Sequence, residues 1–402
     1  MTGKDPTLRD DVDAGGIGPL GDRSDTAARD FEPAPASRRA APGDVRRWPA
    51  EWERHEATWI AWPHHEPDWP GKLGPIPWVY AEIVRALHRH ERVEILCHDD
   101  VVAEAARTHL EAHGVRDNFR LHVVPNDRVW LRDSGATGVL REDGTLEWVN
   151  WHFNAWAKYD NYARDEQVGA AMAEITGVPI VQPQRPDGKG RVVLEGGGIE
   201  TDGSGTMLVT EEWLLSDVQI RNPGLSREEY EQVFRDWLGI RHTIWLGEGC
   251  VGDDTHGHID DIARFVAPGV IVLAYEEDPA DDENHRRSVD NMRRLELAGA
   301  GRGALKVVKI PYPRAVEMHG ERLPASYANF YIANGVVIVP TFNDPNDRIA
   351  LNALAELMPD REVVGIHSVD LVWGLGTLHC LSQQQPAAKS GQDARRIGPE
   401  RF

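Results

Sequence analysis

The sequence has few cysteines, no long apolar run and fewer basic than acidic residues, and each of these features excludes a class of protein. Cys97, Cys250 and Cys380 are too few and too scattered for a disulfide framework or a close-spaced metal knuckle. No apolar stretch approaches the roughly 18 residues of a membrane span, and the N-terminus lacks the basic-then-apolar pattern of a secretory signal. We therefore expect a cytoplasmic protein that does not bind membranes.

Acidic residues outnumber basic ones by 65 to 44, which gives a net charge of -21. This surplus repels nucleic acid and attracts cations, so we expect no nucleic-acid partner. The 41% hydrophobic and 27% charged residues are typical of a globular protein with a sizeable core. Residues 1–45 and 387–402 are rich in Gly, Pro, Ala and charge. This predicts a disordered extension at 1–45 and a flexible tail at 387–402, flanking a single domain at 46–386.

Between the predicted tails one pattern recurs: a hairpin of two apolar strands, an amphipathic helix and a lone strand. Hairpin turns are predicted at Asp143-Gly144, Gly203 to Gly205, Pro268-Gly269 and Asn334-Gly335. Helices are predicted at 162–176, 226–238, 282–298 and 347–358, and an earlier helix at 78–90 leads into a fifth lone strand. Five ββαβ units of about 60 residues indicate an α/β fold with radial repetition around a central axis.

Chemically active side chains recur with the same period. Glu195 follows Asp133 by 62 residues, and His258 follows Glu195 by 63. Cys380 lies 122 residues beyond His258, which is two further steps. Because equivalent loops of radially repeated units converge at one end of the axis, this spacing predicts that the four side chains share a pocket.

A Cys, a His and several carboxylates in one pocket suggest a particular chemistry. Cys380 would be the nucleophile. His379 directly precedes it, but neighbours on an extended strand face opposite sides, so the base must be another residue, and His258 is the candidate. Buried carboxylates without an evident Lys or Arg partner require a cation, and a guanidinium matches two of them. The predicted reaction is thiolate attack, loss of ammonia, a covalent thiouronium intermediate and hydrolysis to a ureido product.

Simpler interpretations remain open for each residue. Cys97 is expected to be a small buried apolar residue. Cys250 lies in a glycine-rich loop close to His258 in sequence and is a rival nucleophile. The His-Gly-His stretch that ends at His258 could be a metal-binding pair. Glu195 could be a solvated turn residue, and Asp133 could only cap a turn.

Several segments resemble those of agmatine deiminases, within the wider group that includes bacterial peptidylarginine deiminases. Along 48–386 they are, in order, WLRDSGAT, FNAWAKYDNY, LEGGGIETDGSGTMLVTEEWLL, GHIDDIARF, YANFYIANGVVIVPTFNDPND and GLGTLHCLSQQQP. The resemblance implies a five-bladed, pseudo-fivefold α/β propeller of the pentein type, in agreement with the repeat. It also implies that no metal or organic cofactor is used and that the chain forms a homodimer or a larger homo-oligomer.

The resemblance further implies a role for each residue of the site. The implied roles are Cys380 as nucleophile, His258 as general acid and base, Glu195 as the partner of His258, and Asp133 with Asp260 as guanidinium ligands. Asp260 lies two residues after His258, so on a strand both side chains would face the pocket. Trp130 matches a family Trp near the alkyl chain of the substrate, although simple core packing is an equal alternative.

The sequence departs from the family pattern at a few positions around these motifs. Ala136 stands where Pro is usual, Thr377-Leu378 where Asn-Ile is usual, and Gly198 and Glu200 where Asn and His are usual. We expect a hydrolase that converts agmatine, a small cationic guanidino compound, to N-carbamoylputrescine and ammonia. The alternatives are a deiminase of peptidyl-arginine or another guanidino compound, an amidinotransferase, a metallohydrolase and a non-catalytic guanidine-binding protein.

Overall fold

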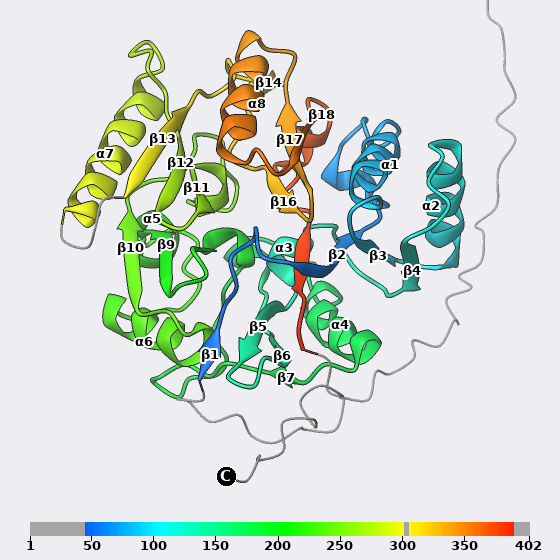
Figure 1. Cartoon of the computed structure of the whole chain (residues 1–402), viewed down its shortest axis with the longest axis horizontal. Helices are drawn as coiled ribbons and strands as arrows, with labels where there is room; N and C mark the ends of the chain where they lie inside the picture. The colour runs from blue at the N-terminus through cyan, green and yellow to red at the C-terminus, as the bar shows by residue number, and fades with distance from the viewer. Residues whose placement is uncertain (1–44, 301–304, 390–402) are drawn as a thin grey trace, which may run out of the picture. The chain divides into compact units, whose positions relative to one another are not determined.

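The computed structural model describes residues 45–300 and 305–389, which form a mixed α/β fold of small sheets (Figure 1). The predicted extension at 1–45 and most of the predicted tail at 387–402 lie outside the described residues. In the described part of the chain, no helix has the length and apolarity that a membrane span requires.

Four of the predicted units are present, each with an antiparallel hairpin whose second strand pairs in parallel with the strand after the helix. The hairpins are β5 (Thr137–Arg141) with β6 (Leu146–Val149), β8 (Glu200–Thr201) with β9 (Thr206–Thr210), β11 (Ala263–Ala267) with β12 (Val270–Ala274), and β16 (Tyr331–Ala333) with β17 (Val336–Thr341). The helices and closing strands are α4 (Val168–Thr176) and β7 (Ile180–Val181), α6 (Arg227–Leu238) and β10 (His242–Leu246), α7 (Asp282–Gly299) and β13 (Lys306–Ile310), and α8 (Pro345–Leu357) and β18 (Glu362–His367). All four hairpins are therefore confirmed.

The predicted helix boundaries agree with the structure within a few residues, except at α4. This helix starts six residues later than expected, because the 3₁₀ turn η3 (Asp165–Gln167) precedes it. Capping explains the accurate starts elsewhere. Ser226 and Glu229 form a reciprocal capping box at the start of α6, and Gly239 in the left-handed conformation ends it.

The remaining unit is completed by the C-terminal end of the described chain. Its parallel strands are β2 (His55–Ala61), β3 (Arg92–Cys97) and β4 (Phe119–Val123), connected by α1 (Ile76–Leu87) and α2 (Asp100–Ala112). β19 (Gln383–Pro386) pairs antiparallel with β2, and Figure 1 shows the red strand beside the blue one. α2 and β4 are additions that the repeat did not predict. The pairing of β19 with β2 anchors the segment that directly follows Cys380.

Shorter elements connect the units. They are β1 (Arg46–Arg47), which pairs with β5, the hairpin of β14 (Glu317–Met318) and β15 (Glu321–Arg322), the helices α3 (Leu131–Ser134) and α5 (Glu211–Leu215), and the 3₁₀ turns η1 (Glu66–Asp68), η2 (Ala155–Ala157), η4 (Gly196–Gly198), η5 (Ile259–Asp261) and η6 (Leu371–Gly374). α3 contacts η4, and η4 contacts η5. Three short turns from successive units thus meet inside the domain.

Candidate active site

The predicted site residues lie at the ends of these contacting turns. Asp133 is in α3, Glu195 and His258 are the residues that precede η4 and η5, and Asp260 is in η5. Cys380 lies in a turn just before β19. All five side chains are buried. The structure therefore brings together segments that are 247 residues apart in the sequence.

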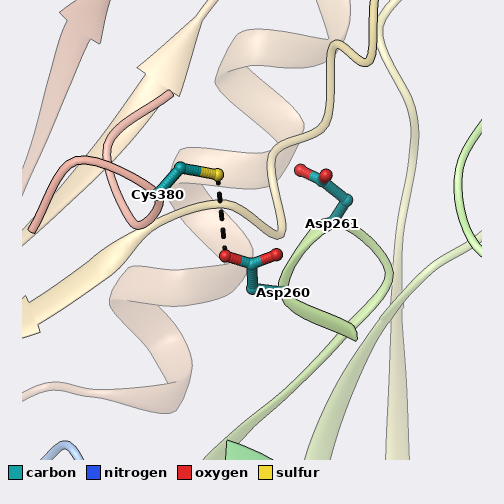
Figure 2. Close-up of side chains that lie close together, drawn as sticks. All are labelled: Asp260, Asp261 and Cys380. Atoms are coloured by element: carbon teal, nitrogen blue, oxygen red, sulfur yellow. Dashed lines mark hydrogen bonds between the residues drawn. The ribbon is translucent and has the colours of Figure 1, made fainter. Parts of the chain in front are cut away.

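The Cys380 thiol faces the two neighbouring carboxylates of η5 (Figure 2). Its Sγ lies 3.6 Å from Asp260 Oδ2, and Asn329 Nδ2 donates to Sγ at 3.0 Å. Burial and the charges of Asp260, Asp261 and Asp133 raise the pKa of Cys380 well above its usual value. In the absence of a bound cationic ligand the sulfur is therefore held as a thiol.

The local structure at Cys380 differs from the extended strand that the sequence suggested. Residues 378–381 form a turn, with Leu381 N donating to Thr377 O at 3.2 Å. His379 and Cys380 consequently do not face opposite sides: His379 Nδ1 lies 2.7 Å from the same Asp260 oxygen that Cys380 approaches. The second ring nitrogen of His379 lies 2.8 Å from Glu51 Oε2.

His258 is buried between two carboxylates but hydrogen-bonds to neither. Its Nδ1 is 3.8 Å from Asp133 Oδ1, and its Nε2 is 3.6 Å from Glu195 Oε2. Both ring nitrogens lack a hydrogen-bond partner among the described residues. Burial lowers the pKa of His258, but the charges of Asp133, Glu195 and Asp260 more than compensate and raise it to about 9. The ring is therefore a cation near neutral pH, with its protons available to a ligand.

Glu195 is fixed by two donors that hold it in its charged form. Trp213 Nε1 donates to Oε2 at 2.8 Å, and Arg221 Nε donates to Oε1 at 3.0 Å. Burial raises the pKa of Glu195, but Arg221 and His258 outweigh this effect and lower it to about 2. Glu195 is therefore a permanent negative charge beside His258.

Asp133 is held by a different pair of donors. Gly197 N and Trp156 Nε1 each donate to it at 2.9 Å. Burial raises the pKa of Asp133 to about 6, with His258 acting in the opposite direction and Asp260 and Glu195 adding to the rise. Gly197 must be glycine, because a Cβ there would lie 2.6 Å from His258 Nδ1.

Among the described residues, only one of the two carboxylate oxygens of Asp260 has a hydrogen-bond partner. Oδ2 accepts from His379, whereas Oδ1 is buried and has no hydrogen-bond partner in the described ranges. Burial raises the pKa of Asp260, but His379 and more distant cations lower it below its usual value overall. Asp260 lies in a 3₁₀ turn and not on a strand, so the alternation argument from the sequence was wrong although the side chain does reach the site.

Trp130 lies against the segment that carries Cys380. A Cβ on Gly376 would lie 2.8 Å from the Trp130 ring and 3.1 Å from the Cys380 Cβ. The ring is also part of the apolar core and lies 5.8 Å from the Trp69 ring, centroid to centroid. Both expectations for Trp130, core packing and proximity to the site, are therefore compatible with its position.

The other two cysteines have different surroundings. Burial raises the pKa of Cys97 to about 12. Cys250 is buried as well, its Sγ donates to Val251 O at 3.5 Å, and burial raises its pKa well above the usual value. Cys97 Sγ contacts Ile95 O at 3.9 Å, so within the described residues both thiols face backbone carbonyls.

The positions of side chains that could bind a metal ion test the alternative that the His-Gly-His stretch is a metal-binding pair. Within the described chain, the set of three potential ligands that lie within 4.8 Å of one another is Asp260, Asp261 and Cys380. His256 instead lies 2.9 Å from Ser216 Oγ and has a positive φ of 66°. Carboxyl groups beside the thiol favour a bound cation, and a guanidinium is a cation that pairs with carboxylates.

Sequence reasoning missed several residues that support the site. They are Asn329, Trp156, Trp213, Arg221 and Glu51. Asn329 joins both sides of the site, because Nδ2 contacts Asp261 at 3.0 Å and Cys380, while Oδ1 accepts from Thr377 Oγ1 at 2.7 Å. Three of these residues lie in the motifs YANFY, FNAWAKYDNY and LVTEEWLL, which was the available signal.

The departures at Thr377, Gly198 and Glu200 all lie close to the site residues or their supports. Thr377 holds Asn329, and a Cβ on Gly198 would lie 2.4 Å from the Trp213 ring that binds Glu195. Glu200 accepts from Arg264 Nε at 2.8 Å. Ala136 is buried in the core.

Comparison with known proteins identifies the family. The family profile of the Porphyromonas-type peptidyl-arginine deiminases matches residues 47–386. The chain belongs to this family. It is 37% identical over 365 residues to the agmatine deiminase of Stutzerimonas stutzeri, covering 84% of this chain and 95% of that protein. It is 36% identical over 370 residues to the agmatine deiminase of Pseudomonas aeruginosa, covering 86% and 97%.

Solved structures agree with this assignment. The agmatine deiminase of Enterococcus faecalis superimposes with a TM-score of 0.77 at 31% identity, covering 85% of this chain and 96% of that one. A cysteine-to-serine variant of agmatine deiminase from C. jejuni with substrate bound superimposes with a TM-score of 0.76 at 25% identity, covering 88% and 99%. The mixed α/β fold is therefore that of the agmatine deiminase structures.

Proposed function

We propose that this chain is an agmatine deiminase, a hydrolase that converts agmatine and water to N-carbamoylputrescine and ammonia. The observation that carries the proposal is the convergence of the Cys380 thiol, the His258 imidazolium and the carboxylates of Asp133, Glu195 and Asp260 in a single buried site. The names of the relatives that are 36% and 37% identical over most of the chain support the same activity.

Recognition begins with the two carboxylates that face the thiol and the imidazole. Asp133 and Asp260 would bind the guanidinium through paired charge-assisted hydrogen bonds, and the unpartnered Oδ1 of Asp260 would accept one of them. Trp130 would lie beside the alkyl chain of the substrate. The positive charge of the substrate opposes the carboxylates that raise the pKa of Cys380, so binding favours the thiolate.

The first chemical half-reaction would form the covalent intermediate. The Cys380 thiolate attacks the central guanidinium carbon, and the new C–S bond converts that carbon to a tetrahedral centre. His258 gives its proton to one of the nitrogens, the C–N bond breaks, and ammonia leaves. The product of this step is an S-alkylthiouronium.

The second half-reaction would hydrolyse this intermediate. The now neutral His258 takes a proton from water, and the resulting hydroxide adds to the thiouronium carbon. The C–S bond breaks, its electron pair returns to Cys380, the hydroxyl proton passes to the released sulfur, and the neutral ureido product leaves. The charge of Glu195 would keep His258 basic enough to accept that proton.

Three wider features belong to the same proposal. The five hairpin-helix-strand units would be arranged as a five-bladed, pseudo-fivefold α/β propeller. The chain would act in the cytoplasm as a homodimer or a larger homo-oligomer. The substrate would be a small cationic guanidino compound.

Peptidyl-arginine is the second candidate substrate, because the matching family is described by that activity. Ammonia release should therefore be measured with agmatine, free arginine, a peptidyl-arginine and other guanidino compounds. We expect the highest kcat/KM with agmatine, no release by Cys380→Ala, and activity retained by Cys250→Ala. A preference for peptidyl-arginine would replace the proposed substrate, and full turnover by Cys380→Ala would refute the mechanism.

An amine acceptor and a chelator separate the remaining alternatives. A hydrolase gives the ureido product with or without an added amine. An amidinated amine would instead identify an amidinotransferase. Loss of activity with chelator together with resistance to thiol alkylation would identify a metallohydrolase.

A further inference from the structure

A buried chain of charged side chains continues from Asp260 into the domain. His379 connects Asp260 Oδ2, 2.7 Å from its Nδ1, to Glu51 Oε2, 2.8 Å from its Nε2. The pKa values of Asp260 and Glu51 are both lowered, so both carboxyl groups are ionised. A neutral imidazole has only one N–H, so hydrogen bonds to two ionised carboxylates require both ring nitrogens to be protonated. His379 is therefore an imidazolium held between two carboxylates.

Glu51 is itself fixed by two arginines. Arg264 Nη2 donates to Oε1 at 2.7 Å, and Arg132 Nη2 donates to Oε2 at 3.2 Å. Arg264 is fully buried and also binds Glu200 through Nε at 2.8 Å. Burial raises the pKa of Glu51, but Arg264 and His379 lower it well below its usual value. The far end of the chain of charges thus has little freedom to move.

These contacts determine the orientation of the Asp260 carboxylate in the site. Oδ2 is charge-paired with His379, while Oδ1 is buried without a partner in the described residues. We propose that His379, held by Glu51, is a positioning residue that fixes the Asp260 carboxylate with Oδ1 available to the guanidinium. The inference rests on the proposed function of the site and assigns the specific task of its second histidine. Because His379 directly precedes Cys380, the same contact also fixes the thiol beside that carboxylate.

Loss of the imidazolium should also change the pH dependence of substrate binding. Several charged or titratable groups interact electrostatically with the Asp260 carboxylate. They are His379 and Cys380 from the C-terminal turn, His258 and Asp261 from its own segment, Asp133 from α3, and Arg264 from β11. The imidazolium is the closest cation, so a neutral replacement makes Asp260 easier to protonate. The acidic limb of kcat/KM then moves to higher pH.

Two amide replacements separate positioning from general structural support. The amide nitrogen of Asn lies near the position of Nδ1, and that of Gln lies near the position of Nε2. His379→Asn can therefore still donate to Asp260, whereas His379→Gln can donate only to Glu51. We expect His379→Gln to raise KM for agmatine about 10- to 100-fold, with a smaller effect on kcat, and His379→Asn to raise KM less. A purely structural role predicts the opposite order, because Asn leaves the larger cavity.

The matched control is His122→Asn, which removes the donor from another buried carboxylate, since His122 Nε2 on β4 lies 2.6 Å from Glu94 Oε2 on β3. It should leave KM and the pH profile unchanged. Wild-type KM and pH profile in both His379 variants, or greater impairment of the Asn variant, would overturn the inference. If neither variant folds, Glu51→Gln, which preserves the side-chain shape, must raise KM in the same direction, and an unchanged KM overturns the inference.

Binding without turnover distinguishes this inference from the proposed function. Calorimetry measures agmatine binding to Cys380→Ala and to Cys380→Ala combined with His379→Gln. Affinity about 10- to 100-fold weaker in the double variant supports the positioning role even if the wild type releases no ammonia. Equal affinity in the two proteins refutes the positioning role even if the wild type is an active deiminase.

Discussion

Two buried histidines lie in the same site, and their surroundings are opposite. His379 has both ring nitrogens within 2.8 Å of carboxylate oxygens. His258 has its ring nitrogens 3.6 and 3.8 Å from carboxylates and no hydrogen-bond partner among the described residues. A hydrogen-bonded imidazolium is held in place and cannot easily give up its protons, whereas an unbonded one can donate to a ligand. The comparison supports the proposed roles, positioning for His379 and proton transfer for His258.

The largest expected effect is the loss of His258. In His258→Asn no side chain at that place can transfer a proton, so we expect kcat for ammonia release to fall by at least about 10³-fold. Steady-state assays with agmatine measure this effect, with thermal unfolding as a check of folding. A kcat within tenfold of the wild type would mean that another group, His379 included, is the acid and base.

The pH dependence of stability tests the charge state of His258. Its pKa in the folded protein is about 9 against about 6.5 for a free histidine, so its ion pairs stabilise the fold fully below pH 6.5. That contribution, on the order of 3 kcal/mol, is lost as the pH rises through 9. The difference in free energy of unfolding between wild type and His258→Asn should therefore shrink between pH 6.5 and 9 in urea titrations. A constant difference over this range would contradict the raised pKa.

Glu195→Gln sharpens the comparison by removing the charge beside His258 while keeping its shape. The carboxylate raises the pKa of His258, so its loss should move the upper limb of the kcat profile to lower pH. We expect kcat to fall about 10- to 100-fold. The pH–rate profile measures both changes, and an unshifted upper limb would show that Glu195 does not act through His258.

The smallest effect concerns the donor that holds Asp133. Trp156→Phe removes the 2.9 Å indole hydrogen bond and keeps most of the ring volume. KM for agmatine should rise up to about 10-fold, with kcat nearly unchanged, because Asp133 is proposed to bind the guanidinium. A matched change, Trp148→Phe, removes an indole bond to Thr176 on α4 and should leave KM unchanged. Equal effects of the two changes would argue against a specific role for Trp156.

The sequence by itself determined the local elements and the candidate side chains. Hairpin turns such as Asn334-Gly335 and caps such as Ser226 depend on neighbouring residues, so their positions followed from the order of the residues. The period of about 60 residues led to Asp133, Glu195, His258 and Cys380, because chemically equivalent loops repeat with the unit that carries them. The family motifs added Asp260.

Only the tertiary structure decided what each of these side chains contacts. The strand that completes the first unit is β19, whose first residue, Gln383, pairs with Trp59, 324 residues earlier, and no local pattern specifies such a pairing. The opposite states of His258 and His379 depend on Asp133, Glu195 and Glu51, which arrive from separate units. The turn at 378–381 reversed the expected direction of His379, because hydrogen bonds formed after folding override the alternation of a strand. Residue types set the chemistry available to this protein, and packing decides which histidine is held by hydrogen bonds and which is available for proton transfer.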